Sequence, residues 1–314
     1  MTQTTSSAPC DISVPDKTGA RAQASSASIA VCPVCPHRCQ LAPGQRGRCR
    51  ARRNVGGAVV AESYGRVTSL ALDPIEKKPL ARYRPGSFVV SVGGYGCNLR
   101  CPFCQNYEIS QAGPDDTPWR AIEPDELVRC ALEARARDAR VQGIAYTYNE
   151  PLVAWEYVRD CAELAHKNGL INVLVSNGCV EPMVLDALDG LIDAANIDLK
   201  GFTAAWYEAC GAGPHAFDCV TGTIERLAQN AACHLEVTTL VIPDMNDADA
   251  EIDEAARWLA GLDNGAGRST TTYHLTRFFP RWRLTDRPAT PVSTVYHLAD
   301  VARRHLTHVY TGNC

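Results

Sequence analysis

The sequence contains no long hydrophobic run and no excess of positive charge. Among its 314 residues, no apolar stretch approaches the ~20 residues that a membrane-spanning helix needs. Its first 30 residues lack the basic and then apolar order of a secretory signal. With 31 Lys and Arg against 35 Asp and Glu, the net charge is −4, whereas nucleic-acid binders usually carry a basic excess. These absences predict a cytoplasmic protein with no membrane or nucleic-acid partner.

The chain also has no Gly-x-Gly-x-x-Gly motif between a strand and a helix, which argues against a dinucleotide-binding fold. Its composition is that of an ordinary globular protein, with 46% hydrophobic and 21% charged residues. We expect three parts. Residues 1–30 are a disordered Ser/Ala/Thr-rich tail, residues 31–87 a Cys/Arg-rich metal-binding extension, and residues 88–314 an α/β domain.

From residue 88 onward, short apolar runs alternate with amphipathic segments that are typical of helices. The runs cover residues 88–92, 143–148, 171–176, 195–199, 234–242 and 272–278. Buried strands that alternate with such helices indicate a parallel sheet. Six units of this kind fit an open doubly wound sheet or a partial (β/α)6 TIM-like barrel, and we favour the barrel. In a barrel the functional residues follow the carboxyl ends of the strands.

Cysteine, in contrast, is abundant. Fifteen cysteines without a secretory signal indicate reduced thiols, and they argue against a disulfide scaffold. Seven of the fifteen fall into two tight groups, and we expect the other eight to be ordinary core or surface residues. Clustered cysteines in a reducing compartment more often hold a metal.

The first group is Cys97, Cys101 and Cys104, spaced C-x3-C-x2-C in GGYGCNLRCPFC, which we call the three-cysteine loop (residues 93–104). Three thiolates on one short loop reach three corners of an iron–sulfur cube, and the glycines let the backbone wrap closely. A structural zinc site closes with four ligands, whereas three leave one metal position open for chemistry. The alternative is a zinc site whose fourth ligand, such as His37 or another cysteine, lies elsewhere in the chain.

The second group is Cys32, Cys35, Cys39 and Cys49, spaced C-x2-C-x3-C-x9-C, which we call the four-cysteine segment (residues 32–49). Four thiolates complete one zinc site or one iron–sulfur cluster. The sequence does not distinguish between zinc and an iron–sulfur cluster at this segment. Prolines and glycines make the segment loop-like, so a metal would have to order it. Residues 32–53 contain six arginines and no acidic residue. Three interpretations of these arginines are open: a solvated face, stabilisation of the thiolates, or contact with an acidic partner.

The three-cysteine loop resembles the signature of the radical S-adenosylmethionine (SAM) superfamily, with Phe103 at the aromatic position. The resemblance implies that the three cysteines hold a [4Fe–4S] cluster, that SAM binds its fourth iron and that Phe103 lies near the adenine. It also implies that an electron cleaves SAM to a 5′-deoxyadenosyl radical, which removes a hydrogen atom from a substrate. The protein then supplies orientation and a pocket without water.

Polar residues after three later apolar runs extend the resemblance. They are Asn149, Glu150, Ser176, Asn177, Asp198 and Lys200, in the segments TYNEP, SNG and NIDLK. The last two segments resemble those of glycyl-radical activating enzymes. By this resemblance Glu150 accepts hydrogen bonds from the SAM ammonium, Lys200 pairs with the SAM carboxylate, and Asp198 helps to hold a cation or the ribose side. The plainer alternative for each is a capped turn or a surface ion pair, which their recurrence at successive strand ends disfavours.

The four-cysteine segment narrows the family further. Together with DPIEKKPLARYRPGS (residues 73–87) and YHLTRFFPRW (residues 273–282), it resembles the radical SAM enzymes of the AmmeMemoRadiSam system, relatives of pyruvate formate-lyase activating enzyme. This resemblance implies a reductant such as flavodoxin or ferredoxin, and a protein substrate or a Memo-type partner. His274, Arg277 and Arg281 belong to the last strand segment and face the expected rim of the active site, so we expect them to contact the substrate.

Two classes of function follow from these patterns. The first is a radical SAM enzyme that cleaves SAM reductively and abstracts hydrogen, with a protein glycine as one substrate. Methyl transfer and modification of a small molecule or RNA are alternatives, since a signature does not fix the substrate. The second is a non-catalytic iron–sulfur or zinc protein, either an electron carrier or an interaction module. An electron carrier needs four protein ligands for each cluster, so the three-cysteine loop favours the enzyme.

Overall fold

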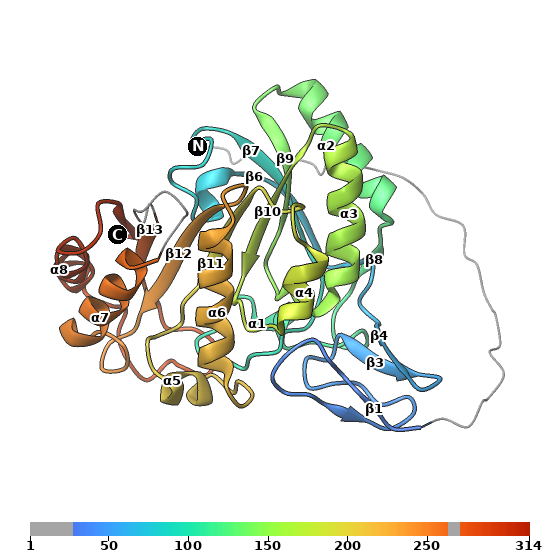
Figure 1. Cartoon of the computed structure of the whole chain (residues 1–314), viewed down its shortest axis with the longest axis horizontal. Coiled ribbons are helices and arrows are strands. Elements are labelled where there is room, and N and C mark those ends of the chain that lie inside the picture. The colour runs from blue at the N-terminus through green and yellow to red at the C-terminus, as the bar shows by residue number, and fades with distance from the viewer. Residues whose placement is uncertain (1–27, 263–270) are drawn as a thin grey trace, which may run out of the picture.

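The computed structural model describes residues 28–262 and 271–314. Residues 1–27 of the predicted tail lie outside the described residues. Its centre is an eight-stranded sheet with the order β14-β13-β12-β11-β10-β9-β7-β6 (Figure 1). The strands are β6 (Ser69–Pro74), β7 (Phe88–Gly93), β9 (Val141–Tyr146), β10 (Ile171–Ser176), β11 (Ala194–Asp198), β12 (His234–Val241), β13 (Thr272–Arg277) and β14 (Val309–Gly312). All neighbours pair in parallel except β6 and β7.

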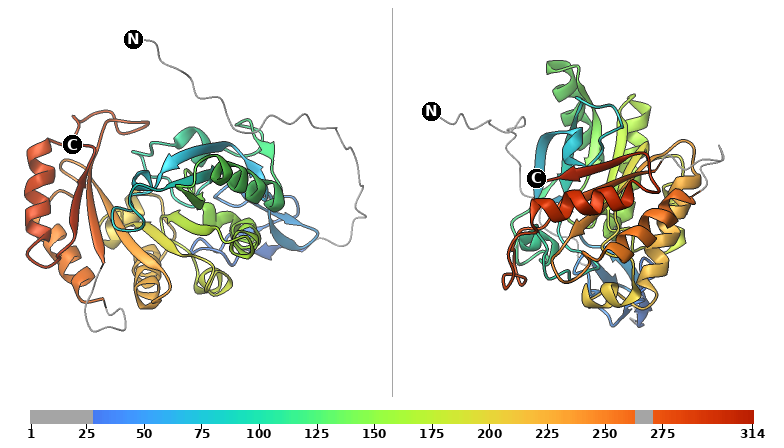
Figure 2. Two further views of the ribbon diagram at one scale, coloured as in Figure 1. Left: turned by 90° about the horizontal axis from the view of Figure 1, so that it is seen from above. Right: turned by 90° about the vertical axis from the view of Figure 1, so that its left-hand side faces the viewer.

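Helices alternate with these strands along the chain and pack against the curved sheet (Figure 2). They are α2 (Pro124–Arg137), α3 (Trp155–Lys167), α4 (Pro182–Ala187), α6 (Ala216–Gln229), α7 (Asp249–Ala260) and α8 (Val292–Ala302), with the short helices α1 (Tyr107–Ser110) and α5 (Ala204–Ala209). The sheet does not close on itself, because β6 and β14 form its two edges. The predicted α/β class and partial TIM-like barrel are confirmed.

The six predicted strands are all present, because each is a short run of buried, mostly apolar residues. Gly143 shows how closely they pack, since a Cβ there would lie 1.9 Å from the carbonyl oxygen of Ile171 on β10. The sequence did not place either of the two edge strands in this sheet. β14 has only four residues, and β6 pairs antiparallel with partly exposed side chains, so neither has the continuous apolar pattern of an inner parallel strand.

The segment after β6 fills one side of the sheet. Its 3-10 helix η1 (Ile75–Lys77) and Leu80 bury apolar side chains against β7, β9 and β10. Beside them, the Lys78 ammonium lies 2.8 Å from the Asp73 carboxylate, and the Tyr148 hydroxyl donates to the same carboxylate at 2.7 Å. Although burial opposes the shift, these two donors hold the pKa of Asp73 well below its usual range. The segment is therefore fixed by apolar packing and by a buried ion pair.

A second buried carboxylate joins this segment to β12. Glu236 is 0% exposed and accepts hydrogen bonds from the backbone amides of Ala81 and Arg82 at 3.0 and 2.8 Å. Its oxygens also lie 2.9 Å from His234 Nε2 and 2.5 Å from His274 Nε2. Burial works to raise the pKa of Glu236, but the two histidines and the two amides outweigh it and lower the pKa to about 2. Glu236 therefore connects sheet positions that are far apart in the sequence.

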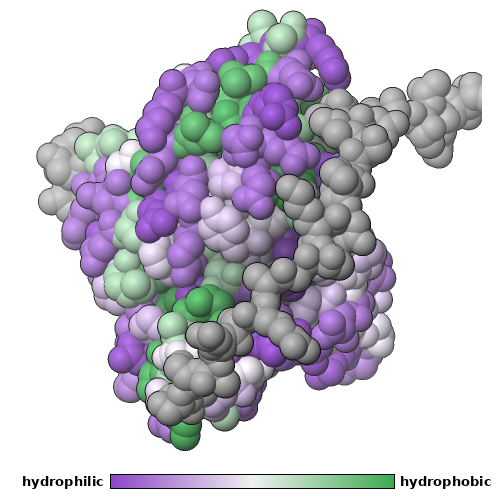
Figure 3. Space-filling model, turned by 90° about the vertical axis from the view of Figure 1, so that its right-hand side faces the viewer, coloured by the Kyte–Doolittle hydropathy of each residue, from purple (hydrophilic) through white to green (hydrophobic). Residues whose placement is uncertain are grey.

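The N-terminal extension consists of small hairpins. They are formed by β1 (Ala30–Val31) with β2 (Gln40–Leu41) and by β3 (Arg52–Val55) with β4 (Ala58–Ala61), and β5 (Arg66–Val67) pairs with β8 (Arg120–Ala121). Figure 1 shows the β1 and β3–β4 strands below the sheet, on the same side as α5. The face in Figure 3 is mostly hydrophilic, with scattered hydrophobic residues. Within residues 28–262 and 271–314, no helix has the length and apolar character to cross a bilayer.

Replacing Glu236 tests the buried carboxylate. Glu236→Gln should lower the free energy of unfolding by about 1–3 kcal/mol at pH 7. The neutral amide replaces a charged acceptor, and its NH2 group cannot accept the hydrogen bonds that one carboxylate oxygen accepts. The folded state lowers the pKa of Glu236 from the ordinary 4.5 to about 2, so the ionised carboxylate stabilises the folded protein at pH values above 4.5. This stabilisation is lost as the pH falls from 4.5 toward about 2. Urea unfolding between pH 7 and 3 should therefore show a shallower acid dependence in the variant. The exposed Glu254→Gln should match the wild type, and equal acid dependence in all three proteins would contradict the assignment.

Candidate functional site

The three-cysteine loop begins at the carboxyl end of β7, and its thiols lie close together. Burial raises the pKa of Cys97, and negative charge at Glu150, Cys101 and Cys104 raises it further, so all of these groups are neighbours. The pKa of Cys101 is lowered, first by a hydrogen bond from the buried Cys210 thiol and, against the effect of burial, by the Lys200 ammonium. A thiol with a lowered pKa loses its proton more readily, which a metal ligand requires.

Further polar contacts surround the remaining loop sulfurs. The Cys104 Sγ lies 3.1 Å from the Ser110 hydroxyl oxygen, and the backbone amide of Leu99 donates to the Cys97 Sγ at 3.4 Å. Asn177 Nδ2 lies 3.6 Å from the Cys97 Sγ as well. Hydrogen bonds of this kind to metal-bound sulfurs stabilise the thiolate form and tune a cluster.

Asn149 holds the backbone of the same loop. Its Oδ1 accepts from the amide of Gly94 at 3.0 Å, and its Nδ2 donates to the carbonyl of Gly96 at 3.0 Å. The loop also approaches the end of β9 so closely that a Cβ on Gly93 would lie 2.8 Å from the carbonyl oxygen of Thr147. Asn149 therefore positions the three-cysteine loop, and its predicted contact with a cofactor stays a prediction.

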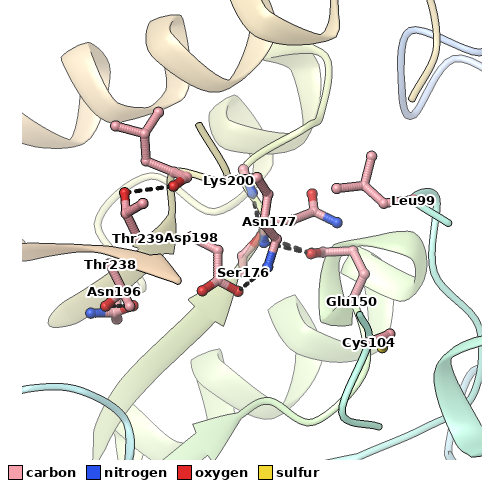
Figure 4. Close-up of polar contacts among 12 residues, drawn as sticks. Leu99, Cys104, Glu150, Ser176, Asn177, Asn196, Asp198, Lys200, Thr238 and Thr239 are labelled. Atoms are coloured by element: carbon pink, nitrogen blue, oxygen red, sulfur yellow. Dashed lines mark hydrogen bonds and ion pairs between the residues drawn. The ribbon is translucent and has the colours of Figure 1, made fainter. Parts of the chain in front are cut away.

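Glu150 lies at the centre of a hydrogen-bond network that joins the ends of β9 and β10 (Figure 4). Its Oε1 accepts from the Ser176 hydroxyl at 2.8 Å and from the Leu152 amide at 3.0 Å, and its Oε2 accepts from the Asn177 amide at 2.8 Å. Burial raises the pKa of Glu150 to about 7, although these three donors oppose the shift. A carboxylate has about four acceptor positions, so Glu150 retains capacity for one more donor.

Asn177 connects this network to the three-cysteine loop. Its Nδ2 donates to Asn98 Oδ1 at 2.9 Å, and Asn98 Nδ2 donates to the carbonyl of Cys179 at 2.6 Å. The end of β10 and the loop after β7 are thus fixed to each other by side-chain amides. Asn98 lies inside the signature motif, yet the sequence analysis assigned it no role.

Asp198 and Lys200 form an ion pair at the end of β11, with 3.0 Å between the carboxylate and the ammonium. Burial lowers the pKa of Lys200, but Asp198 and Cys101 raise it more, and the pKa lies above its usual value. The Lys200 carbonyl accepts hydrogen bonds from the indole of Trp206 and from Asn246 Nδ2. The backbone under the pair is therefore held in place, and Figure 4 shows both side chains close to Ser176 and Asn177.

The aromatic residue of the motif has a partner that the sequence analysis missed. Phe103 stacks on Trp206 with 5.9 Å between the ring centroids and 9° between the planes, and both side chains are buried. Trp206 and Cys210 come from α5 and the residue after it, where no motif marks them. Packing alone brings them to the site, so a single sequence contains no signal for them.

The structure gives the two substrate candidates other partners. His274 is buried, bonds to Glu236 and stacks on Tyr310, and the Arg277 Nε donates to the carbonyl of Thr290 at 2.7 Å. Parallel pairing aligns Asp198 with Thr238 and Thr238 with His274, so His274 lies level with Asp198 two strands away. Direct contact of His274 or Arg277 with a substrate stays a prediction.

The donor set of the three-cysteine loop suits an iron–sulfur cluster. A cluster requires several thiolates close together, and the loop supplies three neighbouring thiols. The Cys97 sulfur also accepts an N–H group, and the loop packs so closely at Gly93 that there is no space for a Cβ. Among the described residues, no three His, Cys, Asp or Glu side chains are arranged to hold one metal ion. The cysteines of an iron–sulfur cube each bind a different iron.

The comparison with known families agrees with this site. The sequence model of the Radical SAM superfamily matches residues 91–259, which is more than half of the chain. The chain belongs to the radical SAM superfamily, whose members use a [4Fe–4S] cluster and SAM. A curated relative, "Uncharacterized protein MJ0808" of Methanocaldococcus jannaschii, is 40% identical over 283 residues, covering 90% of this chain and 80% of the relative.

A more distant relative and two solved structures complete the comparison. A protein of the same archaeon that is provisionally named a glycyl-radical enzyme activating enzyme is 24% identical over 172 residues, 54% of this chain and 62% of the relative. A radical SAM methyltransferase from Sphaerobacter thermophilus has a TM-score of 0.54 at 17% identity, with 73% and 67% of the two chains covered. Streptococcus suis SuiB bound to SAM has a TM-score of 0.51 at 10% identity, with 72% and 52% covered. At these identities, the two structures show a shared fold alone.

A matched pair of glycine substitutions tests the close packing of the loop. Gly93→Ala should displace the three-cysteine loop, because its Cβ would lie 2.8 Å from the Thr147 carbonyl oxygen and 2.9 Å from the Tyr148 Cβ. We expect a loss of about 1–3 kcal/mol in unfolding free energy and less iron for each chain after anaerobic reconstitution. Gly222→Ala, within α6 and with nothing within 4 Å of the new Cβ, should keep its iron and gain roughly 0.5–1 kcal/mol. Equal iron contents in the two variants would show that the loop tolerates displacement.

Proposed function

We propose that this protein is a radical SAM enzyme of the glycyl-radical activating type, within the AmmeMemoRadiSam branch. One observation carries the proposal, namely the 24% identity over 172 residues to a protein provisionally named as such an activating enzyme. The segments SNG and NIDLK, which end β10 and β11, support it. Membership of an enzyme superfamily disfavours the non-catalytic alternative.

When bound, the [4Fe–4S] cluster and SAM supply the reductive cleavage of SAM and the radical that abstracts hydrogen. We assign the cluster ligands to Cys97, Cys101 and Cys104. Glu150 offers its remaining acceptor position to the SAM ammonium, and Lys200 offers its charge to the SAM carboxylate. Ser176 and the Asn177 amide keep the Glu150 carboxylate in place, since both donate to it at 2.8 Å.

The pocket also has to close around the reactants, because a closed site prevents side reactions of a reactive intermediate. Phe103 and Trp206 are buried and stacked beside Cys101, and we assign them this role on the adenine side. The Lys200 ammonium already pairs with the Asp198 carboxylate. When SAM binds, its carboxylate would replace Asp198 as the partner of Lys200 or become a second partner.

The reaction needs partners that the chain does not contain. Radical SAM enzymes take electrons from an external donor, and we propose a flavodoxin or ferredoxin in the cytoplasm. We further propose a protein substrate that presents a glycine, with a Memo-type protein as another candidate partner. His274 and Arg277 stay as candidates for substrate contact.

Loss of one cluster ligand tests the catalytic centre. Cys101→Ala should abolish formation of 5′-deoxyadenosine from SAM under dithionite, because the cluster loses a corner. Glu150→Gln should keep the cluster but bind SAM about 10- to 100-fold more weakly, since a charge-assisted hydrogen bond is worth about 1.5–3 kcal/mol. Cys161→Ala removes a buried thiol on α3 and should keep full turnover. Turnover by Cys101→Ala would refute the assignment of the cluster.

Isotope transfer tests the substrate class. The wild-type enzyme, SAM and dithionite are incubated with a library of octapeptides that contain α-dideuterated glycine at one position. Deuterium in the 5′-deoxyadenosine, measured by mass spectrometry, is expected with this library and not with its deuterated-alanine counterpart. Formation of unlabelled 5′-deoxyadenosine with both libraries would count against a peptide glycine while leaving SAM cleavage intact.

A further inference from the structure

The four-cysteine segment contains a second group of thiols that the proposed reaction does not use. Cys32, Cys35 and Cys49 are buried and Cys39 is partly exposed, and all four are free thiols. The Cys39 and Cys49 sulfurs both lie close to Gly47, and the Cys32 amide bonds to the Cys39 carbonyl. The four thiols are therefore gathered in one small unit of the chain.

Two tight turns bring these thiols together. In the first turn, the Arg38 amide donates to the Cys35 carbonyl at 3.0 Å, and the Cys32 amide donates to the Cys39 carbonyl at 2.9 Å across the β1–β2 hairpin. In the second turn, the Arg50 amide donates to the Gly47 carbonyl at 2.9 Å. A Cβ on Gly47 would lie 3.8 Å from both the Cys39 and the Cys49 Sγ, so the two turns face each other.

A buried guanidinium beside these thiols has one N–H group that lacks an acceptor. Arg52 is 3% exposed, and its terminal nitrogens bond to Glu156 and to the carbonyls of Val153 and Val59. Its Nε–H has no acceptor among the described residues. Burial raises the pKa of Cys32, and the adjacent Arg52 opposes that shift. A buried donor without an acceptor is unfavourable, whereas thiolates bound to a metal accept such N–H groups.

Both turns also contact the three-cysteine loop. A Cβ on Gly96 would lie 2.4 Å from the Cys49 carbonyl oxygen, so the backbones touch directly before Cys97. His37 Nε2 lies 2.8 Å from the Asn98 carbonyl oxygen, and Arg100 donates to the Arg48 carbonyl at 2.7 Å. The position of the three-cysteine loop therefore depends on the shape of the four-cysteine segment.

We propose that Cys32, Cys35, Cys39 and Cys49 form a closed tetrathiolate metal centre that supports the three-cysteine loop. Four protein ligands leave no open metal position, so this centre does not bind SAM and acts by ordering the segment. Because no three of these thiols are arranged to hold a single metal ion, a [4Fe–4S] cluster, in which each thiolate binds a different iron, fits them better than a zinc ion does, and metal analysis distinguishes the two.

The first experiment uses a full-length variant in which Cys97, Cys101 and Cys104 are all alanine. This variant lacks the proposed catalytic cluster, so failure of the proposed function does not affect the result. Purified anaerobically, it should contain about one zinc ion, or about four iron atoms with sulfide, for each chain. Adding Cys35→Ser should remove that metal, whereas adding Cys161→Ser should keep it. A folded triple variant that binds neither metal would overturn the proposal.

A titration covers the case in which Cys35→Ser does not fold. The metal-free triple variant is reconstituted anaerobically with ferrous iron and sulfide and followed by absorbance. A sulfur-to-iron charge-transfer band that saturates at about four iron atoms for each chain is expected. Its absence in protein with native circular dichroism would also overturn the proposal.

The support of the loop has its own test in a chain that keeps Cys97, Cys101 and Cys104. Cys39→Ser changes the most exposed of the four ligands, and Cys161→Ser is the matched control. After reconstitution, Cys39→Ser should lose iron from the three-cysteine loop to a chelator about 10-fold faster than the control, the scale on which outer groups affect a metal site. Equal rates of iron loss, with the N-terminal metal absent from Cys39→Ser, would overturn the supporting role.

Discussion

The buried carboxylate of Glu150 is the interaction on which the geometry of the site depends. It joins two parallel strands at their carboxyl ends, where backbone amides have no further strand to bond. Without it, the buried amide of Asn177 would lose its acceptor, and the strand end that carries Asn177 beside Cys97 would be held less firmly. A single acceptor thus aligns the sheet, the three-cysteine loop and the place that we assign to SAM.

Much of this arrangement could be predicted from the sequence, because local chemistry determines it. The inner strands are continuous apolar runs, and the motif residues lie at their ends, where a parallel sheet gathers them. The edge strands β6 and β14 could not be predicted in the same way, since edge strands have short and mixed patterns. Trp206 and Cys210 were missed because only tertiary packing brings α5 to Phe103 and Cys101.

Two predicted residues show how buried contacts change an interpretation. The sequence presents His274 as a polar residue of the last strand that faces the rim, which is typical of a substrate contact. In the structure it completes the environment of Glu236, an acidic residue that the sequence analysis did not consider. Asn149 was predicted to bind a cofactor, and its side chain holds the loop that carries the cluster ligands. A sequence shows which residues are near a site, whereas their partners decide what each one does.

The bonds from Glu236 to the amides of Ala81 and Arg82 have a consequence for synthesis of the chain. Their partners lie 155 and 154 residues apart in the sequence, so the segment after β6 cannot be fixed until β12 has left the ribosome. The four-cysteine segment, in contrast, closes through short-range turns near the N-terminus. During translation the four thiols therefore become available to a metal long before the sheet is complete.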